Sequence, residues 1–409
     1  MRATRTFLAA ALAVLALLPL LPATASAQSD PYYIGLSQTF SHEDNLIRLR
    51  DGQQTPAGLT KADTQSSTAL VAGINQNFGR QRLSGSGSVR SNRYSNNSAF
   101  NNQGYSLNLG LQWETIESLS GSVSVAADRS LRADLRDRNG NFITGGNSET
   151  SRDLDLRARY GLFGPWSLTA GAAWRKDRFS SDQSSFRDYD QSSGNAGVRW
   201  RPGAQTEFGL GLSQTRVDYP QLFANQVNPN DRRTTNNIDL SAVWTPSGIS
   251  AINARLSRGR TSYDPFPDRN FSATTGALEW NWQATGRLRL DTRLARDIGQ
   301  DSDRATTAFS RTTDTLRFAA EFGVSAKVTA NAVASTYKRQ IVGNGLFVSN
   351  VSGQDDGYGL SLSLRWIALR SLSFGCTAGY ERRNASDNAV LSDAYKGNAV
   401  SCFGQFVLQ

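Results

Sequence analysis

The stretch that decides the fold is YSLNLGLQW at residues 105–113, in which apolar and polar residues alternate without interruption. A period of two places Tyr105, Leu107, Leu109, Leu111 and Trp113 on one face of a β-strand, and the intervening polar or small residues on the other face. The strand ends on an aromatic residue and a short turn is expected after it. The rest of the chain repeats this unit.

Nine aromatic residues mark the repeats. Successive members are 35 to 47 residues apart, which suits one hairpin with a short and a long connection. Transmembrane barrels place aromatic residues at the membrane–water interface, where the amphipathic ring lies in the headgroup layer. A soluble β-helix or sandwich also alternates, but it does not require an aromatic at every second strand end. The expected girdle comprises Phe78, Trp113, Tyr160, Trp200, Trp244, Trp282, Phe322, Trp366 and Phe406.

The expected connections give a strand count. Eight short turns follow the first eight girdle aromatics and join sixteen strands, while one strand precedes them at 32–40 and one follows at 400–408. We therefore expect an all-β fold, a transmembrane antiparallel up-and-down β-barrel of about eighteen strands, with sixteen as the alternative. Nine longer segments are expected as extracellular loops: 41–65, 95–104, 130–150, 176–192, 216–234, 259–272, 297–312, 338–356 and 383–396.

The N-terminal residues predict secretion. Arg2 and Arg5 precede an apolar run over residues 7–21, and Ala25-Ser26-Ala27 offers small residues for cleavage. The alternative, a membrane anchor, needs ~20 apolar residues, more than this run supplies. We expect a cleaved signal peptide at 1–27, a single barrel domain with short periplasmic turns at 28–409, and a location in the outer membrane of a Gram-negative bacterium.

Composition agrees with a barrel. The chain has 44 Lys and Arg against 35 Asp and Glu, a net charge of +9, and no Pro-rich linker or charge block divides it after residue 27. Barrels look hydrophilic because half of each strand faces water. A barrel of about eighteen strands leaves an aqueous channel unless something fills it, and no plug domain is expected before the first strand.

The residue inventory gives no support for catalysis. The chain has one His, His42, expected as a solvated loop residue, and no His/Cys cluster or Gly-rich phosphate loop. The acidic stretch 354–357 suits either a weak divalent-cation site or, more simply, a solvated turn. We expect no enzyme activity, no cofactor, no metal site and no nucleic-acid partner, and outer-membrane lipid as the surrounding partner.

Inward-facing charges are the best guide to a substrate. Opposite charges on the wall of a channel pair with one another, so an Arg–acid ladder can be purely structural; alternatively, an excess of Arg forms an electropositive filter that attracts anions. The candidate lining residues are Arg157, Arg159, Arg199, Arg255, Arg287, Arg289, Arg293, Arg317 and Arg365, with Asp239, Asp291, Glu279 and Glu321. Four more inward acids are Glu114, Asp153, Asp155 and Glu207.

The two cysteines, Cys376 and Cys402, fall on the last two expected strands and on the apolar face of each. Their numbers centre the connecting hairpin at residue 389, within the expected loop 383–396, so the two residues can lie directly opposite one another. A disulfide is compatible with that placement and with passage through an oxidising periplasm. The alternatives are two small, unbonded lipid-facing residues, or a register shifted by two or four residues.

The stretch FSHEDNLIRL at 40–49 resembles the Asp-Asn stretch with an apolar-Arg-Leu ending that opens EpsL-type outer-membrane barrels, which are grouped as β-barrel porins and accompany exopolysaccharide biosynthesis. The chain is also similar to AlgE-type alginate exporters, 18-stranded barrels with an Arg-rich lumen. The resemblance implies export of an exopolysaccharide, lumenal Arg contacts with its acid or hydroxyl groups, and periplasmic export components as partners. A nutrient-uptake porin for sugars or small anions, and a non-conducting structural or adhesive barrel, are the alternatives.

The last strand resembles the terminal strand that the barrel-assembly machinery reads in bacterial outer-membrane proteins. Val400, Cys402, Gly404, Phe406 and Leu408 alternate as that pattern requires, but Gln409 takes the final position, where an aromatic is usual. The resemblance implies insertion by that machinery.

Overall fold

The computed structural model describes residues 31–132, 137, 141–161, 164–221, 231–264, 267, 270–301, 309–343, 351–385 and 393–409. The signal peptide expected at 1–27 lies outside these residues. Among the described residues no helix is both long and apolar enough to cross a membrane.

Eighteen antiparallel strands and two short 3₁₀ helices account for the regular structure of the described residues. The strands are β1 Tyr32–Glu43, β2 Asp63–Phe78, β3 Gln81–Tyr94, β4 Asn102–Glu114, β5 Leu119–Leu131, β6 Ser148–Tyr160, β7 Trp166–Phe179, β8 Tyr189–Gly203, β9 Thr206–Tyr219, β10 Asp231–Ser247, β11 Ser250–Asp264, β12 Phe271–Gln283, β13 Leu288–Asp301, β14 Phe309–Gly323, β15 Val328–Gly343, β16 Val351–Leu369, β17 Leu372–Ala385 and β18 Tyr395–Leu408; the helices are η1 Ser98–Phe100 and η2 Asp182–Arg187.

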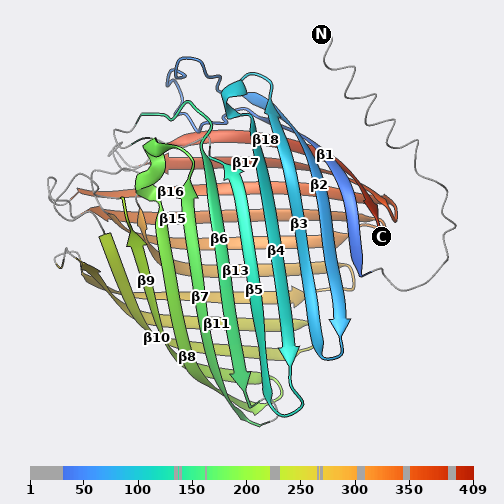
Figure 1. The fold of residues 1–409 in the computed structure, drawn as a ribbon, viewed down its shortest axis with the longest axis vertical. Helices are drawn as coiled ribbons and strands as arrows, with labels where there is room; N and C mark the ends of the chain where they lie inside the picture. The colour runs from blue at the N-terminus through green and yellow to red at the C-terminus, as the bar shows by residue number, and fades with distance from the viewer. Residues whose placement is uncertain are drawn as a thin grey trace.

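The sheet closes on itself. Each strand pairs with its sequence neighbours, and β1 pairs with β18 over ten residue pairs, from Ile34 opposite Leu408 to Glu43 opposite Ala399. The result is a tilted up-and-down barrel with short turns at one end and longer loops at the other (Figure 1). Closure leaves no unpaired strand edge. The expected eighteen strands are confirmed, and the sixteen-strand alternative is wrong.

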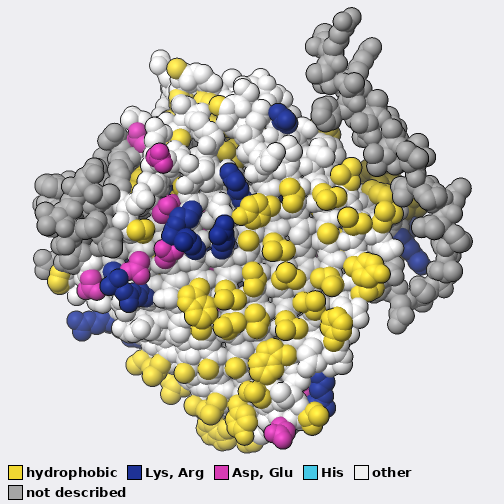
Figure 2. All heavy atoms as spheres, in the orientation of Figure 1, with side chains coloured by type: hydrophobic (Ala, Val, Ile, Leu, Met, Phe, Trp, Pro, Cys, Tyr) yellow, Lys and Arg dark blue, Asp and Glu magenta, His cyan; other side chains and the backbone are white. Residues whose placement is uncertain are grey.

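The apolar face of the barrel is its outside. Side chains such as Leu240, Leu294 and Leu362 are all more than half exposed, although each lies at the middle of a strand. Figure 2 shows apolar side chains spread over the outer face of β2–β9, with charged side chains gathered toward the loop ends of the strands. An outer surface of this kind is stable when hydrocarbon covers it, because exposing large apolar areas to water is unfavourable.

The girdle aromatics lie at the turn end of the barrel. Each of the nine falls within the last four residues of an even-numbered strand, from Phe78 at the end of β2 to Phe406 near the end of β18. Several have an aromatic partner on the same face: the ring centroids of Trp166 and Trp200 are 5.8 Å apart, and those of Trp366 and Phe374 are also 5.8 Å apart. The alternation therefore continues to the turns, as the sequence predicts.

At the loop end the strands are longer than the sequence predicts. Residues 216–219 belong to β9, 231–234 to β10 and 351–356 to β16, all of which were assigned to loops. His42 likewise lies in β1, where its Nδ1 is 2.9 Å from Oγ1 of Thr64, and not in a loop. The reason is that both faces of a strand meet water beyond the membrane, so pairing continues after the apolar alternation has ended.

Two of the outer connections have small cores of their own. Leu46, Ile47 and Leu49 of the first loop pack with Phe100 of η1, and all four are buried. Farther along the sheet, Phe186 of η2 forms a second buried cluster with side chains of β9. These clusters hold structured loops against the outer mouth of the barrel.

Candidate functional site

The lumenal wall is the face opposite the apolar one, so strand parity decides which side chains line it. On β6, Arg157 and Arg159 point inward because Leu156, Ala158 and Tyr160 point outward. One side of the wall, built by β1–β5, β17 and β18, carries mainly small neutral residues at mid-height: Ser37, Ser67, Ser84, Ser86, Ser88, Ser106, Asn108, Ser122, Ser124, Thr377 and Ser401.

The charged side of the wall contains a cluster around Glu207 at the turn end of β9. Its carboxylate accepts hydrogen bonds from Arg199 at 2.6 Å, Arg201 at 2.8 Å and Arg159 at 3.0 Å. The Glu207 side chain is only 11% exposed, which strengthens each contact relative to water. Three guanidinium groups share one carboxylate, so the cluster retains a local excess of positive charge.

A hollow of about 690 Å³ lies beside this cluster, on the lumenal side of β3–β8. Besides Arg159 and Arg199, two more of its guanidinium groups lie near carboxylates: Nε of Arg157 is 2.8 Å from Asp155, and Nη1 of Arg80 is 3.8 Å from Glu114. The Nε of Arg159 is buried and has no hydrogen-bond partner among the described residues. The charged residues that line the hollow are Arg80, Arg82, Arg157, Arg159 and Arg199, with Glu114 and Asp155. The hollow is electropositive and suited to an anionic group.

A second lumenal hollow, of about 440 Å³, continues from the first across β7–β12. Asp239 accepts hydrogen bonds there from Ser213, at 2.7 Å, and from Ser257. Arg255 lines the same hollow and forms no ion pair with any described residue. Hydroxyl, amide and guanidinium groups therefore converge on one stretch of wall, and all of them hydrogen-bond well to sugar hydroxyls or carboxylates.

The far side of the charged wall is more nearly balanced. Arg293 contacts Glu279, and Arg289 lies 3.5 Å from Asp291. Arg317 lies opposite Arg293 on the neighbouring strand and has no ion pair among the described residues. The remaining residues predicted on this wall are Glu321, opposite Arg289 on β14, and Arg365 on β16.

Arg287 lies at the edge of the predicted wall. It is an exposed residue in the turn between β12 and β13, one residue before β13 begins. The sequence placed it inward because Arg287, Arg289 and Arg293 share one parity, but the strand begins only at Leu288. The ladder of paired charges describes one part of the wall, because five of the predicted arginines form ion pairs: Arg157, Arg159, Arg199, Arg289 and Arg293. The electropositive filter describes the rest, because Arg255, Arg317 and Arg365 have no ion pair among the described residues.

The outer mouth holds charged groups that sequence reasoning missed. Arg339 forms a two-pronged contact with buried Asp355, and Arg383 donates a hydrogen bond to the hydroxyl of Tyr337 at 2.9 Å. Asp355 was assigned to an acidic loop, but it lies on β16. Its partner Arg339 could have been predicted from the sequence, because both residues keep the inward alternation of β15 and β16 toward the loop ends of these strands.

The first loop reaches over the seam between β1 and β18. Both carboxylate oxygens of Asp44 accept hydrogen bonds from Asn398, at 2.7 and 2.8 Å. The Nε of Arg48, a residue with a left-handed φ of 52°, lies 3.1 Å from Glu381 on the inward face of β17. The residues that carry the EpsL-type resemblance therefore join the outer mouth of the barrel across its closing seam.

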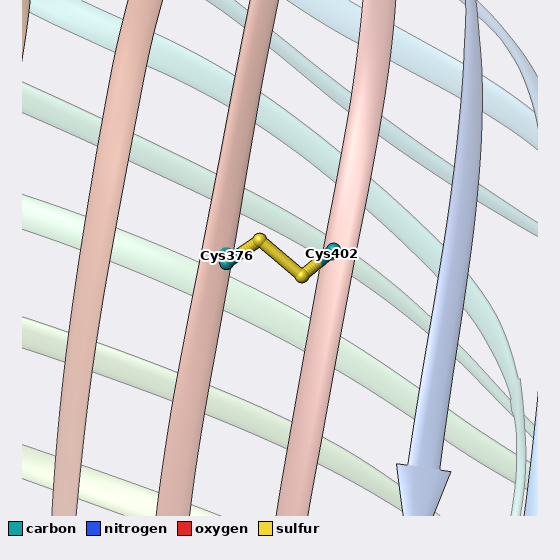
Figure 3. The surroundings of a disulfide bond; sticks show 2 residues. All are labelled: Cys376 and Cys402. Carbon is teal, nitrogen blue, oxygen red and sulfur yellow. A yellow bond between two sulfur atoms is a disulfide. The ribbon is translucent and has the colours of Figure 1, made fainter.

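A disulfide joins Cys376 on β17 to Cys402 on β18 (Figure 3). The two residues lie directly opposite in the register, with Cα atoms 4.1 Å apart. Both have the outward parity of Phe374 and Val400. The bond links two strands beside the seam, on the apolar outer surface.

No group of His, Cys, Asp or Glu among the described residues is arranged to hold a metal ion. The pairings of Asp355 and Asp239 with neighbouring side chains account for two of the inward carboxylates.

No family model and no curated protein matches the chain. Among solved structures, it is similar to Pseudomonas aeruginosa OccK2 (OpdF) in complex with glucuronate, with 12% identity, a TM-score of 0.47, and coverage of 92% of this chain and 98% of that one. It is also similar to P. aeruginosa OccK9 (OpdG), with 11% identity, a TM-score of 0.44 and coverage of 92% and 98%, and to the FrpB iron transporter from Neisseria meningitidis, with 11% identity, a TM-score of 0.44 and coverage of 88% and 64%. Likeness at this level concerns the fold alone.

Proposed function

We propose that this chain is an outer-membrane channel. The observation that carries the proposal is a closed 18-stranded barrel with an apolar exterior and a polar interior, because a barrel of this size encloses an aqueous channel. The girdle end with its short turns faces the periplasm and the long loops face the exterior. The alternating pattern of β18 supports insertion by the barrel-assembly machinery.

We propose an exopolysaccharide as the cargo and export as the direction. Two features support a sugar polymer: the hydroxyl-rich wall of β1–β5, and the facing wall on which Arg255, Asn237 and Asp239 line one hollow. A polar surface distributed along the wall suits a sliding polymer, because many weak contacts replace one another as it moves. The resemblance of residues 40–49 points to the same cargo, with periplasmic export components as partners.

Uptake of sugars or small anions is the second candidate. The hollow of about 690 Å³ favours it, because that volume suits one ligand of ordinary small-molecule size. Its guanidinium groups recognise a single carboxylate as readily as a repeated one. A channel of either kind transports its solute without chemical change, in keeping with the residue inventory.

Single-channel recording with added oligosaccharides separates the two candidates. Uronate oligomers of one to eight residues are added on the turn side, and the duration of each current block is measured. A polymer track predicts block times that lengthen with every added residue. A single small-anion site predicts block times that stop lengthening after the first one or two residues, and this result contradicts polymer export. Neutral oligomers of matched length separate the effect of the carboxylates from that of size.

A further inference from the structure

The outer face of the barrel carries a belt of charge above the apolar band. These residues have the same outward parity as the apolar side chains below them, and they lie toward the loop ends of their strands; Figure 2 shows part of the belt over β6–β9. Among the described residues the basic members are Arg93, Arg129, Arg152, Lys176, Arg178, Arg216, Arg232, Arg258, Arg260, Arg296, Lys338, Arg382 and Lys396, and the acidic members are Asp190, Asp218, Asp264, Asp314 and Asp356.

Pairing leaves part of this belt uncompensated. Arg178 pairs with Asp190 at 2.6 Å, and Arg296 pairs with Asp314 at 2.6 Å. Arg258 and Arg260 on β11 have no ion pair with a described residue, and the only side-chain contact of Arg258 is a hydrogen bond to Oγ1 of Thr274 at 2.9 Å. Both are exposed, and a spacing of two places their Cα atoms ~6.6 Å apart on one face.

A hollow of about 720 Å³ on the outer face of β8–β12 is lined by both of these arginines. Ala196, Leu212 and Ile238 form its apolar part, and Ile238 lies opposite Arg258 in the strand register. Gln214 and Asn236 border it on the polar side. The hollow therefore spans the boundary between the apolar band and the belt, with cationic groups on β11 beside hydrocarbon-compatible groups on β8–β10.

We propose that this hollow binds the phosphorylated lipid A part of lipopolysaccharide from the outer leaflet. Arg258 and Arg260 donate to a phosphate, because the planar guanidinium matches phosphate oxygens in a two-pronged contact. An acyl chain lies over Leu212 and Ile238, and the amides of Gln214 and Asn236 reach the sugar between them. The proposal rests on the outer-membrane location and orientation proposed above, but not on conduction.

A second outer hollow, of about 590 Å³, supplies a matched comparison. It has the same kind of apolar part, with Leu154 and Trp174, below Arg152 and Lys176. The carboxylates of Asp190 and Asp218 also line it, whereas no carboxylate is among the residues that line the Arg258 hollow. Phosphate binding is therefore expected at the Arg258 hollow and not at this one.

Native mass spectrometry of the purified full chain in detergent tests the site, with folding verified by heat-modifiable migration. Wild type, Arg258→Gln/Arg260→Gln and the control Arg152→Gln/Lys176→Gln are each titrated with bisphosphorylated lipid A, with its dephosphorylated form and with phosphatidylglycerol. We expect the Arg258/Arg260 variant to bind bisphosphorylated lipid A at least about tenfold more weakly than wild type, since two charge-assisted contacts are lost. The control variant is expected to match wild type.

Three results overturn the proposal: equal affinity of wild type and the Arg258/Arg260 variant for lipid A, equal affinity of wild type for the phosphorylated and dephosphorylated forms, or binding of phosphatidylglycerol as tight as that of lipid A. The last two comparisons use only wild type, so they decide the matter even if a variant does not fold. Bilayer conductance of the same preparation tests the channel proposal separately, because lipid binding is expected whether or not the barrel conducts.

Discussion

The side-chain amide of Asn45 donates a hydrogen bond at 2.8 Å to the main-chain carbonyl of Lys396, 351 residues farther along the chain. The same side chain bridges Leu49, donating to its carbonyl and accepting from its N–H, both at 2.8 Å. Asn45 is buried, and it fixes the first loop to the last strand at the point where the barrel closes. The first loop is therefore held in place by the strand pair that closes the barrel. Measuring how well the loop is ordered tests whether that closure has formed.

Asn45→Ala is expected to release the first loop. It leaves the carbonyl of Lys396 and both main-chain groups of Leu49 without their partner, at a cost of about 1–3 kcal/mol in the opening free energy of the loop. Hydrogen exchange of peptides covering residues 44–51 measures this cost. Arg50→Ala is the control, because its 3.4 Å ion pair with Asp393 is exposed and contributes little. Unchanged exchange in Asn45→Ala contradicts the seam role.

The disulfide is expected to stabilise the barrel without being needed for its register. Cys376 and Cys402 lie opposite each other within twelve residue pairs between β17 and β18, so the strands are aligned without the bond. A bond between residues 26 apart restricts the conformations of the unfolded chain. Losing such a bond typically lowers the free energy of unfolding by about 2–4 kcal/mol. Urea unfolding of Cys376→Ser/Cys402→Ser against wild type measures the difference, with conductance expected to stay the same. Alkylation of both thiols in denatured, unreduced wild type contradicts the bond.

Anion preference is expected to depend on the lumenal hollow beside Glu207. Arg157→Gln/Arg199→Gln removes two of its positive charges, so the reversal potential in a salt gradient should shift toward cations. Arg258→Gln/Arg260→Gln makes the same change of charge outside the barrel and should leave the potential unchanged. The shift should weaken above ~0.5 M salt, where the Debye length falls to ~4 Å. Equal shifts in the two double variants contradict a local filter.

The loop that contains η2 is expected to be less stable at neutral than at acidic pH. Burial raises the pKa of the Asp188 carboxyl, although a 2.9 Å hydrogen bond from the Phe179 N–H opposes the shift. Because folding raises this pKa, protonation of Asp188 stabilises the folded loop. That stabilisation is complete below the unfolded pKa of ~3.9 and is lost as pH rises through the folded pKa. Hydrogen exchange of residues 180–188, corrected for intrinsic rates, should show this trend in wild type but not in Asp188→Asn. A pH-independent opening free energy in wild type contradicts it.

The number of strands and the direction of their side chains were predictable because the lipid face imposes a period of two from turn to turn. Leu107, Leu109 and Leu111 alone decide the parity of β4, and strands such as β6, β14 and β16 repeat the pattern. The partner of Cys376 followed from the same regularity, since one antiparallel hairpin fixes one sum of residue numbers.

The outer part of each strand was not predictable from that signal. Toward the loop end of β11, the outward residues Arg258 and Arg260 are as polar as the inward residue Thr261, so the apolar–polar alternation ends and nothing in the pattern distinguishes strand from loop. Part of the belt, including Arg260, was therefore assigned to loops. Extending the parity of β11 beyond Leu256 by four residues would have placed Arg260 on the strand.

The cluster around Glu207 was hidden for a different reason. Arg159 on β6 reaches Glu207 on β9, 48 residues away and across two intervening strands. The two side chains can meet only because the lumenal residues on the strands between them are small. These residues are Thr169 on β7, which pairs with Arg159, and Gly197 on β8, which pairs with Thr169. Sequence parity places each group on the wall, but the tilt and register decide which groups meet.

Conductance of the refolded full-length barrel in a planar bilayer tests the central claim most directly. An aqueous channel through eighteen strands predicts discrete, ohmic current steps when single molecules insert, with the same protein showing heat-modifiable migration as proof of folding. Bilayers that stay closed at every voltage, with folded barrel present in the membrane, would contradict an open channel and favour the non-conducting structural barrel.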